Sequence, residues 1–196
     1  MRKLFFMALL IGCCTSHSLG QTTDDPKNEF FVGYSYHSAD INTLTINPHR
    51  TGQNGVNLAY KRNLNEHVGL KLDASAHFKR DSQQLTGGQF TSKRDQYYFL
   101  GGVEFKAPGD SRVTPFAQAL VGASLFRGFT TTTSVAGNVF TFDDATSFAM
   151  ALGGGLDVRV NDRLAIRLVQ ADYAPTFFGS GRQDNFRLSV GVVFKR

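Results

Sequence analysis

Apolar and polar residues alternate one by one through most of this chain. The clearest stretch covers residues 67–79, where Leu70 and Leu72 alternate with Lys71 and Asp73. A period of two places the two sets on opposite faces of a β-strand, because successive side chains of a strand point to opposite sides. The strand is about twice the usual length of ~5–6 residues, and its polar face carries full charges. The pattern predicts a fold made of long strands with one apolar face.

Seven further segments alternate in the same way, with glycine, serine, asparagine and charged residues opposite the apolar side chains. Together with the first they predict eight strands, over residues 29–38, 54–62, 67–79, 96–106, 114–127, 147–160, 164–173 and 185–194. After Leu168 the alternation changes parity, because Gln170 and Asp172 fall where apolar residues are expected. Either a β-bulge near Leu168–Val169 restores both faces, or the strand ends there.

The connections between these segments alternate between short and long. The short ones cover residues 63–66, 107–113 and 161–163. The long ones are rich in Gly, Thr, Ser, Asn and Asp, which predicts four loops, at residues 39–53, 80–95, 128–146 and 174–184. Short turns at one end and long loops at the other are typical of transmembrane β-barrels.

The composition and the glycines favour a membrane barrel over a soluble one. Of the 196 residues, 41% are hydrophobic and 12% aromatic, which excludes a disordered chain. In a soluble lipocalin-like barrel the apolar face points inward. Here the opposite face carries both glycines and full charges, a combination expected where long side chains crowd a narrow lumen. We therefore predict an all-β fold, an eight-stranded antiparallel up-and-down transmembrane β-barrel over residues 29–196.

Aromatic residues fall near both ends of the apolar faces, with aliphatic residues between them. Membrane barrels carry such aromatic girdles at the two lipid–water interfaces. The predicted girdle consists of Phe30, Tyr60, Phe105 and Phe194 at the end with short turns, and Tyr36, Phe78, Tyr97, Phe148, Tyr173 and Phe186 at the other. An apolar surface bounded in this way predicts a barrel set across a lipid bilayer.

Charged residues on the polar face are predicted to form an ion-pair network inside the barrel. Buried charges need partners, and a carboxylate that faces a guanidinium can accept two hydrogen bonds. If residues 161–163 form a three-residue turn, Asp157 lies opposite Arg167. The network either fills a closed lumen or lines a polar pathway with a gate. Its predicted members are Lys71, Asp73, Glu104, Lys106, Asp157, Arg159, Arg167, Asp172 and Arg187, with Lys61 and His77 on the same face.

The N-terminal stretch has the order of a secretory signal peptide. Arg2 and Lys3 precede an apolar run, which Ser18-Leu19-Gly20 follows with a cleavage pattern. This order predicts a signal peptide over residues 1–20 and a periplasmic N-terminal segment over residues 21–28.

Cleavage after Gly20 would leave Gln21 as the mature N-terminus and remove both cysteines of the chain. The mature protein would then form no disulfide. Two alternatives stay open. The segment that ends at Cys13 resembles a lipobox, which predicts a lipidated Cys13, and the apolar run could instead form a buried helix.

Other features argue against nucleic-acid binding, metal binding and catalysis. The formal net charge is +5, and the basic residues are scattered rather than clustered. His37, His49, His67 and His77 lack the spacing of a metal site, and no GxSxG, HExxH or phosphate-binding motif occurs. We therefore expect no enzyme activity, no cofactor, no metal and no nucleic-acid partner.

The chain resembles the OmpA/opacity-type eight-stranded outer-membrane β-barrels, a group also described as porin-family barrels. The resemblance is most specific over residues 153–173 and 185–194. In that family the last strand ends in a pattern that the outer-membrane assembly machinery reads. Ser189, Gly191 and Phe194 match this pattern, whereas Arg196 stands where an aromatic residue is expected.

The resemblance implies a protein of the bacterial outer membrane with both termini in the periplasm. Its partners would then be outer-membrane lipid, lipopolysaccharide and the assembly machinery. We predict that the protein is a membrane-embedded structural or interaction scaffold that presents four extracellular loops, without a ligand that the sequence identifies. The alternatives are a small channel, then an outer-membrane lipid-modifying enzyme, then a secreted lipocalin-like binder.

Overall fold

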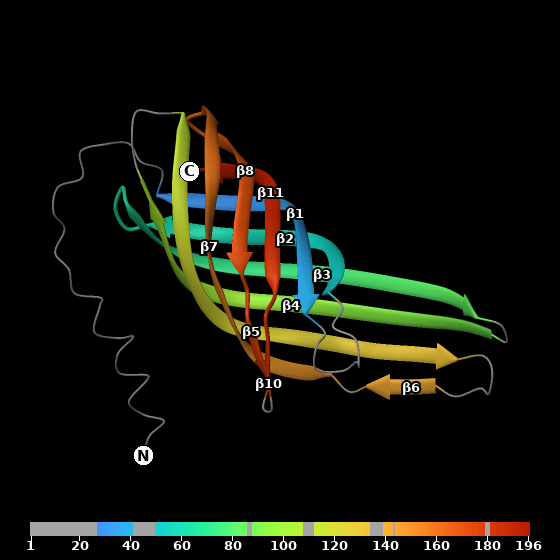
Figure 1. Cartoon of the computed structure of the whole chain (residues 1–196). Helices are drawn as coiled ribbons and strands as arrows, with labels where there is room; N and C mark the ends of the chain where they lie inside the picture. The colour runs from blue at the N-terminus through green and yellow to red at the C-terminus, as the bar shows by residue number, and fades with distance from the viewer. Residues whose placement is uncertain are drawn as a thin grey trace, which may run out of the picture.

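The computed structural model describes residues 27–40, 50–85, 88–107, 112–133, 139–142, 144–178 and 181–196. Within these ranges all regular secondary structure is β (Figure 1). The strands are β1 (Asn28–Asp40), β2 (Arg50–Asn63), β3 (Val68–Leu85), β4 (Gly88–Lys106), β5 (Val113–Thr133), β6 (Val139–Phe142), β7 (Ala145–Asn161), β8 (Leu164–Tyr173), β9 (Thr176–Phe178), β10 (Gly181–Gln183) and β11 (Phe186–Lys195).

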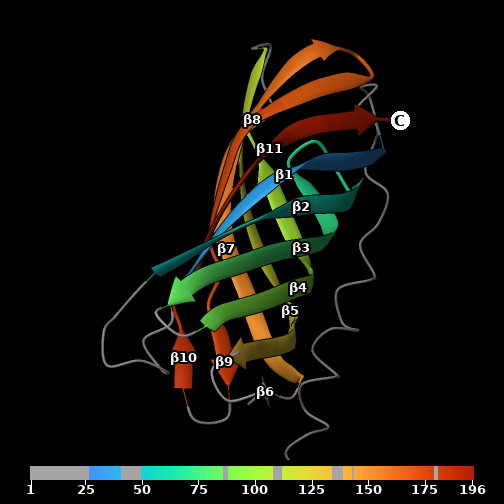
Figure 2. The ribbon, with the colours of Figure 1, turned by 90° about the vertical axis from the view of Figure 1, so that its right-hand side faces the viewer.

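The sheet closes on itself, because β1 pairs antiparallel with both β2 and β11. Around the barrel the order is β1, β2, β3, β4, β5, β7, β8 and β11, with every neighbouring pair antiparallel. The short strands prolong this set: β5 pairs with both β6 and β7, β7 pairs with both β8 and β9, and β10 pairs with β9. Figure 2 shows the strands inclined around a common axis. The predicted eight-stranded antiparallel barrel is confirmed for the described residues.

The predicted bulge is also confirmed. Against β11, Ser189 pairs with Gln170 while Gly191 pairs with Arg167, so two residues of β8 face only Val190. Against β7 the register shifts at the same place. The two residues of the bulge, Leu168 and Val169, both lie on the outer surface, and the strand continues beyond them. The bulge therefore keeps polar side chains inward on both sides of the irregularity.

The prediction of four long loops was wrong in part. Residues 80–95 belong to a hairpin in which β3 and β4 stay paired up to Leu85 opposite Gly88. Strands also continue into the segments predicted as loops at 128–146 and 174–184. In these extensions apolar and polar residues no longer alternate in the sequence, although the backbone pairing persists. Of the predicted loop at 39–53, residues 41–49 lie outside the described residues.

The outer surface of the barrel is apolar and the inside is polar. Leu72, Leu58 and Leu188 are about half exposed, at 62%, 52% and 49%. Inward side chains include Lys71, Arg167 and many other polar groups that are almost completely buried. This is the reverse of a soluble protein, and a closed barrel with an apolar exterior is the β-structure that lipid can surround.

No helix among the described residues is long and apolar enough to cross a membrane.

Candidate functional site

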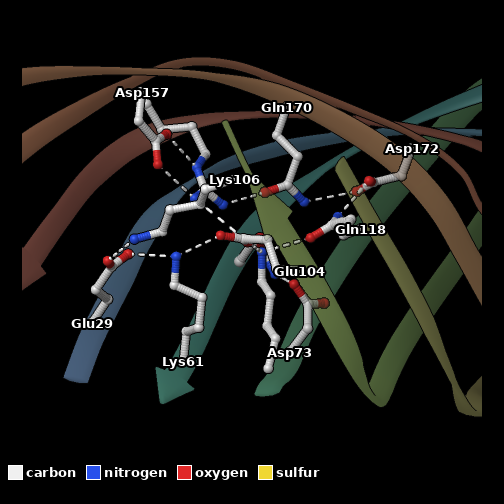
Figure 3. A network of polar contacts seen from close by, with 12 residues as sticks. Glu29, Lys61, Asp73, Glu104, Lys106, Gln118, Asp157, Gln170 and Asp172 are labelled. Atoms are coloured by element: carbon white, nitrogen blue, oxygen red, sulfur yellow. Dashed lines mark hydrogen bonds and ion pairs between the residues drawn. The ribbon is translucent and has the colours of Figure 1, made fainter. Parts of the chain in front are cut away.

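The barrel encloses a set of buried side chains that we call the lumen network (Figure 3). It combines five cations with five anions, so its formal charges cancel. The cations are Lys61, Lys71, Lys106, Arg167 and Arg187, the anions are Glu29, Asp73, Glu104, Asp157 and Asp172, and the amides of Gln118 and Gln170 join them. Charges in such surroundings are stable only when they are paired and fully hydrogen-bonded.

One branch of the network joins side chains of β1, β2, β3 and β4. Glu29 on β1 accepts hydrogen bonds from Lys106 and, at 2.7 Å, from Lys61. The Lys61 ammonium also lies 2.6 Å from Glu104 Oε1, and Lys71 Nζ lies 2.9 Å from Glu104 Oε2. Glu104 therefore bridges two lysines on neighbouring strands, while Glu29 ties the first strand to the same group.

A second branch is centred on Arg187 of β11. Its Nη1 donates to Asp73 Oδ1 at 2.6 Å, and its Nε and Nη2 donate to Asp172 Oδ2 at 3.0 and 2.8 Å. Asn57 donates to Asp73 at 2.9 Å, and Gln118 donates to Asp172 at 2.5 Å. Each carboxylate thus has one charged and at least one neutral donor, as a buried carboxylate requires.

Arg167 joins the two branches and also contacts aromatic rings. It donates to both oxygens of Asp157, from Nε at 2.8 Å and from Nη2 at 2.9 Å, as the predicted hairpin register requires. Its guanidinium carbon lies 4.0 Å from the ring centroid of Phe116 and 4.8 Å from that of Phe31. A Cβ at position 155 would lie 2.8 Å from the Phe116 ring, so Gly155 gives the ring its space.

Removing either partner of the Asp157–Arg167 pair should lower the free energy of unfolding by about 3–5 kcal/mol, because the other charge stays buried. We expect the double variant Asp157→Asn with Arg167→Gln to lose clearly less than the sum of the two single losses. Urea unfolding in lipid vesicles measures all three. Additive losses would contradict the pairing.

A layer of neutral polar side chains lies between the paired charges and the end of the barrel that carries the β3–β4 hairpin. It consists of His37, His77, Gln53, Gln96 and Tyr98. The Tyr98 hydroxyl lies 2.9 Å from His37 Nε2 and accepts from Gln96 at 2.7 Å, and His77 Nε2 lies 2.9 Å from Ser35 Oγ. Several buried atoms of this layer have no hydrogen-bond partner among the described residues: His37 Nδ1, His77 Nδ1, Gln96 Oε1 and both amide atoms of Gln53. Such atoms are normally satisfied by water.

Among the described residues, no group of three or more His, Cys, Asp or Glu side chains is arranged to hold a metal ion. The chemistry that the interior supports is ion pairing and hydrogen bonding.

The structure departs from the predicted network at one position and extends it at others. Arg159 is exposed, because it lies two residues before the end of β7 and is past the level of the paired charges. Glu29 was missed, although it shares the parity of Phe31 and the other inward residues of β1. Gln118 and Gln170 also belong to the network and carry no charge that could have singled them out.

All ten residues of the predicted girdle have side chains on the outer face, half-exposed or exposed. At the end with short turns, the ring centroids of Phe30 and Tyr60 lie 5.0 Å apart. At the other end the centroids of Phe78 and Tyr97 lie 6.0 Å apart, and Phe148 contacts Phe177, which was not predicted. Their position at a lipid–water interface stays a prediction.

The three residues of the predicted assembly signal lie on β11 and do different things there. Ser189 is buried and donates to Ser35 Oγ at 3.1 Å. Gly191 leaves room for the Phe31 ring, which a Cβ would approach to 2.9 Å. Phe194 is 49% exposed on the outer face. Of the three residues, only Phe194 has a side chain that is accessible from the outside of the barrel.

Sequence comparison identifies the family. The family model described as outer membrane protein beta-barrel domain matches residues 5–194, nearly the whole chain. The chain belongs to this family. A search of curated protein sequences finds no significant match.

Solved outer-membrane barrels share the fold at low sequence identity. Ail of Yersinia pestis, solved in complex with the heparin analogue sucrose octasulfate, is 16% identical, with a TM-score of 0.58 over 87% of this chain and 99% of Ail. Neisserial surface protein A is 12% identical, with a TM-score of 0.56 over 87% of this chain and 97% of that one. OprG of Pseudomonas aeruginosa is 13% identical, with a TM-score of 0.50 over 88% and 97%. This outer-membrane barrel thus shares its architecture with several proteins.

Proposed function

We propose that this outer-membrane barrel is a scaffold without an open pore, which presents the outer ends of its strands to the cell's surroundings. The observation that carries the proposal is the burial of the lumen network: Glu104, Arg167 and Arg187 are only 1%, 2% and 1% exposed. In a water-filled pore these side chains would be exposed to water along the axis.

The width of the barrel supports a closed lumen. An eight-stranded barrel has an interior that side chains can just fill, whereas porins with open channels have about 16–18 strands. Here five cations and five anions of the described residues meet across that interior. Opposite charges attract strongly where little water separates them, so the ion pairs keep the lumen closed.

A small channel is the second candidate, and the neutral layer is the observation in its favour. The unpartnered atoms of His37, His77, Gln53 and Gln96 suit a chain of water molecules. That chain would reach only as far as Asp73 and Arg187, which lie below it and are paired. The layer supports a wet outer compartment rather than a path through the barrel.

Conductance across a planar lipid bilayer tests the proposal. We expect the folded, purified protein to show only rare, small openings at neutral pH, because the paired charges leave no continuous water column. Vesicles from the same preparation, in which urea unfolding confirms folded inserted protein, serve as the control for insertion. Steady, large currents from such a preparation would favour the channel over the scaffold.

We also propose the route by which the protein reaches the membrane. A signal peptide over residues 1–20 is cleaved to leave Gln21 as the N-terminus, and the assembly machinery reads Ser189, Gly191 and Phe194. The signal peptide lies outside the described residues. With the short turns in the periplasm, the hairpin of β3 and β4 projects outward, as the long arm of Figure 1 illustrates.

A further inference from the structure

A groove crosses the outer wall of the barrel over β11, β1, β2, β3 and β4, which lie side by side in Figure 2. It has a volume of about 730 Å³, and we call it the wall groove. Two neighbouring cross-strand rows of outward side chains form its walls. One row contains Phe30, Tyr60 and Leu72, and the other contains Leu58, Ala74 and Phe99.

The wall groove rises from the short-turn end of the barrel toward the middle of the apolar wall. A cross-strand row that starts at Arg62 on β2 passes Leu70 on β3 and reaches Tyr173, in the aromatic set of the opposite end. The groove follows the same direction, so its end at Gly101 on β4 lies deeper in the wall than its end at Phe194 on β11.

The length of the wall groove matches that of one lipid tail. Four spacings of about 4.8 Å between its five strands make it about 19 Å long. Half of a hydrocarbon core of ~30 Å is about 15 Å thick, which is the depth that the tails of one leaflet fill. A tail that begins at the short-turn end can therefore lie along the whole groove.

Two small residues keep the deep end of the groove open. Ala74 pairs with Phe99, and Gly101 pairs with Leu72. The two large partners are 54% and 62% exposed, so they stand out from the wall beside the small ones. A Cβ at position 101 would already lie 3.4 Å from Leu72 Cδ2. A large side chain at position 74 would therefore close the groove.

A polar row, which we call the rim row, borders the shallow end of the groove. It consists of Arg196, Asn28 and Arg62, because Asn28 pairs with Arg62 and exchanges two backbone hydrogen bonds of 2.8 Å with Arg196. Arg62 and Arg196 lie two residues beyond Tyr60 and Phe194, and residues two apart on a strand point to the same side. Both arginines are exposed.

The rim row has the donors that a phosphate group needs. The Tyr60 hydroxyl donates to Asn28 Oδ1 at 2.8 Å, which leaves Asn28 Nδ2 to donate outward. Arg62 and Arg196 lie one strand away on either side, about 10 Å apart. Their side chains can therefore converge on one anion in front of Asn28 and form charge-assisted hydrogen bonds with it.

Carboxylates of the short-turn end do not neutralise the rim row. Glu29 points inward and belongs to the lumen network, and Glu66 Oε1 lies 3.5 Å from His67 Nδ1. In the part of the chain that the structure describes, neither Arg62 nor Arg196 forms an ion pair. Positive charge therefore stands at one end of an apolar groove, and this combination is complementary to an anionic lipid.

We propose that the wall groove and the rim row bind one anionic glycerophospholipid, with its phosphate between Arg62 and Arg196 and one acyl chain in the groove. The apolar walls favour a lipid over a soluble anion. A second copy of this chain would bring the same cations to the contact and leave them without a counter-charge. The lipid would belong to the periplasmic leaflet, and only this last assignment rests on the orientation proposed above.

Native mass spectrometry tests the proposal by counting lipids on the folded full-length protein. The protein is released from phosphatidylcholine nanodiscs that contain a small amount of phosphatidylglycerol. The head variant carries Arg62→Gln and Arg196→Gln. Its matched control carries Arg112→Gln and Arg163→Gln, which remove two exposed cations of the same end away from the groove.

A second pair of variants tests the groove and leaves every charge in place. The tail variant, Ala74→Phe, fills the groove. Its matched control, Ala119→Phe, adds the same ring to the exposed outer face of β5. Urea unfolding in lipid vesicles shows that each variant is folded before its lipids are counted.

We expect the head variant to bind phosphatidylglycerol on the order of 25-fold more weakly, since each basic residue near an anionic lipid contributes about fivefold in affinity. The tail variant should lose most of its bound phosphatidylglycerol although it keeps both arginines. The two controls should bind as the wild type does. Rising salt should release the lipid from all proteins that bind it.

Four outcomes would overturn the proposal. Equal binding by wild type and head variant would show that the rim row holds no lipid. An equal loss in the Arg112→Gln and Arg163→Gln control would show a general effect of net charge. Full binding by the tail variant would show surface attraction without a groove. Displacement of the lipid by inorganic phosphate would identify a soluble anion as the occupant. Bilayer conductance is a separate readout, so failure here leaves the scaffold proposal standing.

Discussion

Replacing Arg187 with methionine should lower the free energy of unfolding by at least about 3–5 kcal/mol, the cost of leaving buried charge without its partner. The guanidinium is 1% exposed and holds two carboxylates, Asp73 at 2.6 Å and Asp172 at 2.8 Å. Methionine fills much of the same volume but donates no hydrogen bond. Both carboxylates would then remain with neutral donors alone, from Asn57, Gln118 and Gln170.

Urea unfolding in lipid vesicles provides the measurement. Arg163→Met is the control, because Arg163 is exposed in a turn and its loss should change stability by less than about 0.5 kcal/mol. Adding Asp73→Asn and Asp172→Asn to Arg187→Met should recover much of the loss, since no charge is then left without a partner. An Arg187→Met protein as stable as the wild type would mean that this branch of the lumen network is not formed.

Replacing Leu72 with arginine should lower the free energy of unfolding by about 2–4 kcal/mol, the cost of a cation facing lipid at mid-bilayer. Leu72 is 62% exposed on the outer face of β3, between the two sets of aromatic residues. In water a substitution at so exposed a site would change little. The expected loss therefore reports the solvent around the barrel rather than its internal packing.

Leu64→Arg is the matched control for Leu72→Arg. Leu64 is 55% exposed but lies in the turn between β2 and β3, past the end of the apolar wall. We expect that variant to stay within about 0.5 kcal/mol of the wild type. Equal losses at the two positions, or a larger loss at Leu64, would place the bilayer elsewhere on the molecule.

Alternation along the chain was sufficient to predict which side of the sheet most residues occupy. Gln170 and Asp172 revealed the bulge, because their polar character showed that the inward parity had changed after Leu168. A three-residue turn over 161–163 predicted the pair of Asp157 and Arg167; the pair is present, but Asn161 pairs with Leu164, so the turn has two residues and a register shift between Arg159 and Asn161 compensates. Local spacing determines both results, so no knowledge of distant strands was needed.

Alternation does not give position along the barrel axis. Arg159 has the inward parity of Asp157 but lies near the end of its strand and is exposed. The partners of Arg187 depend on how far neighbouring strands are staggered, because Asp73 is 114 residues away in the sequence. The outer hairpin was missed for a different reason: from Arg80 onward apolar and polar residues no longer alternate in the sequence, so the apolar signal ends before the strand does.

The distribution of the lumen network along the chain has a consequence for assembly. Glu29 belongs to the first strand and Arg187 to the last. A sheet that still lacks β11 carries surplus negative charge at Asp73 and Asp172, and one that lacks β1 carries surplus positive charge at Lys61 and Lys106. Neither half-built sheet can enter hydrocarbon without exposing ions to it. We therefore expect neutralisation of the lumen network and closure of the seam between β1 and β11 to occur together when the barrel inserts.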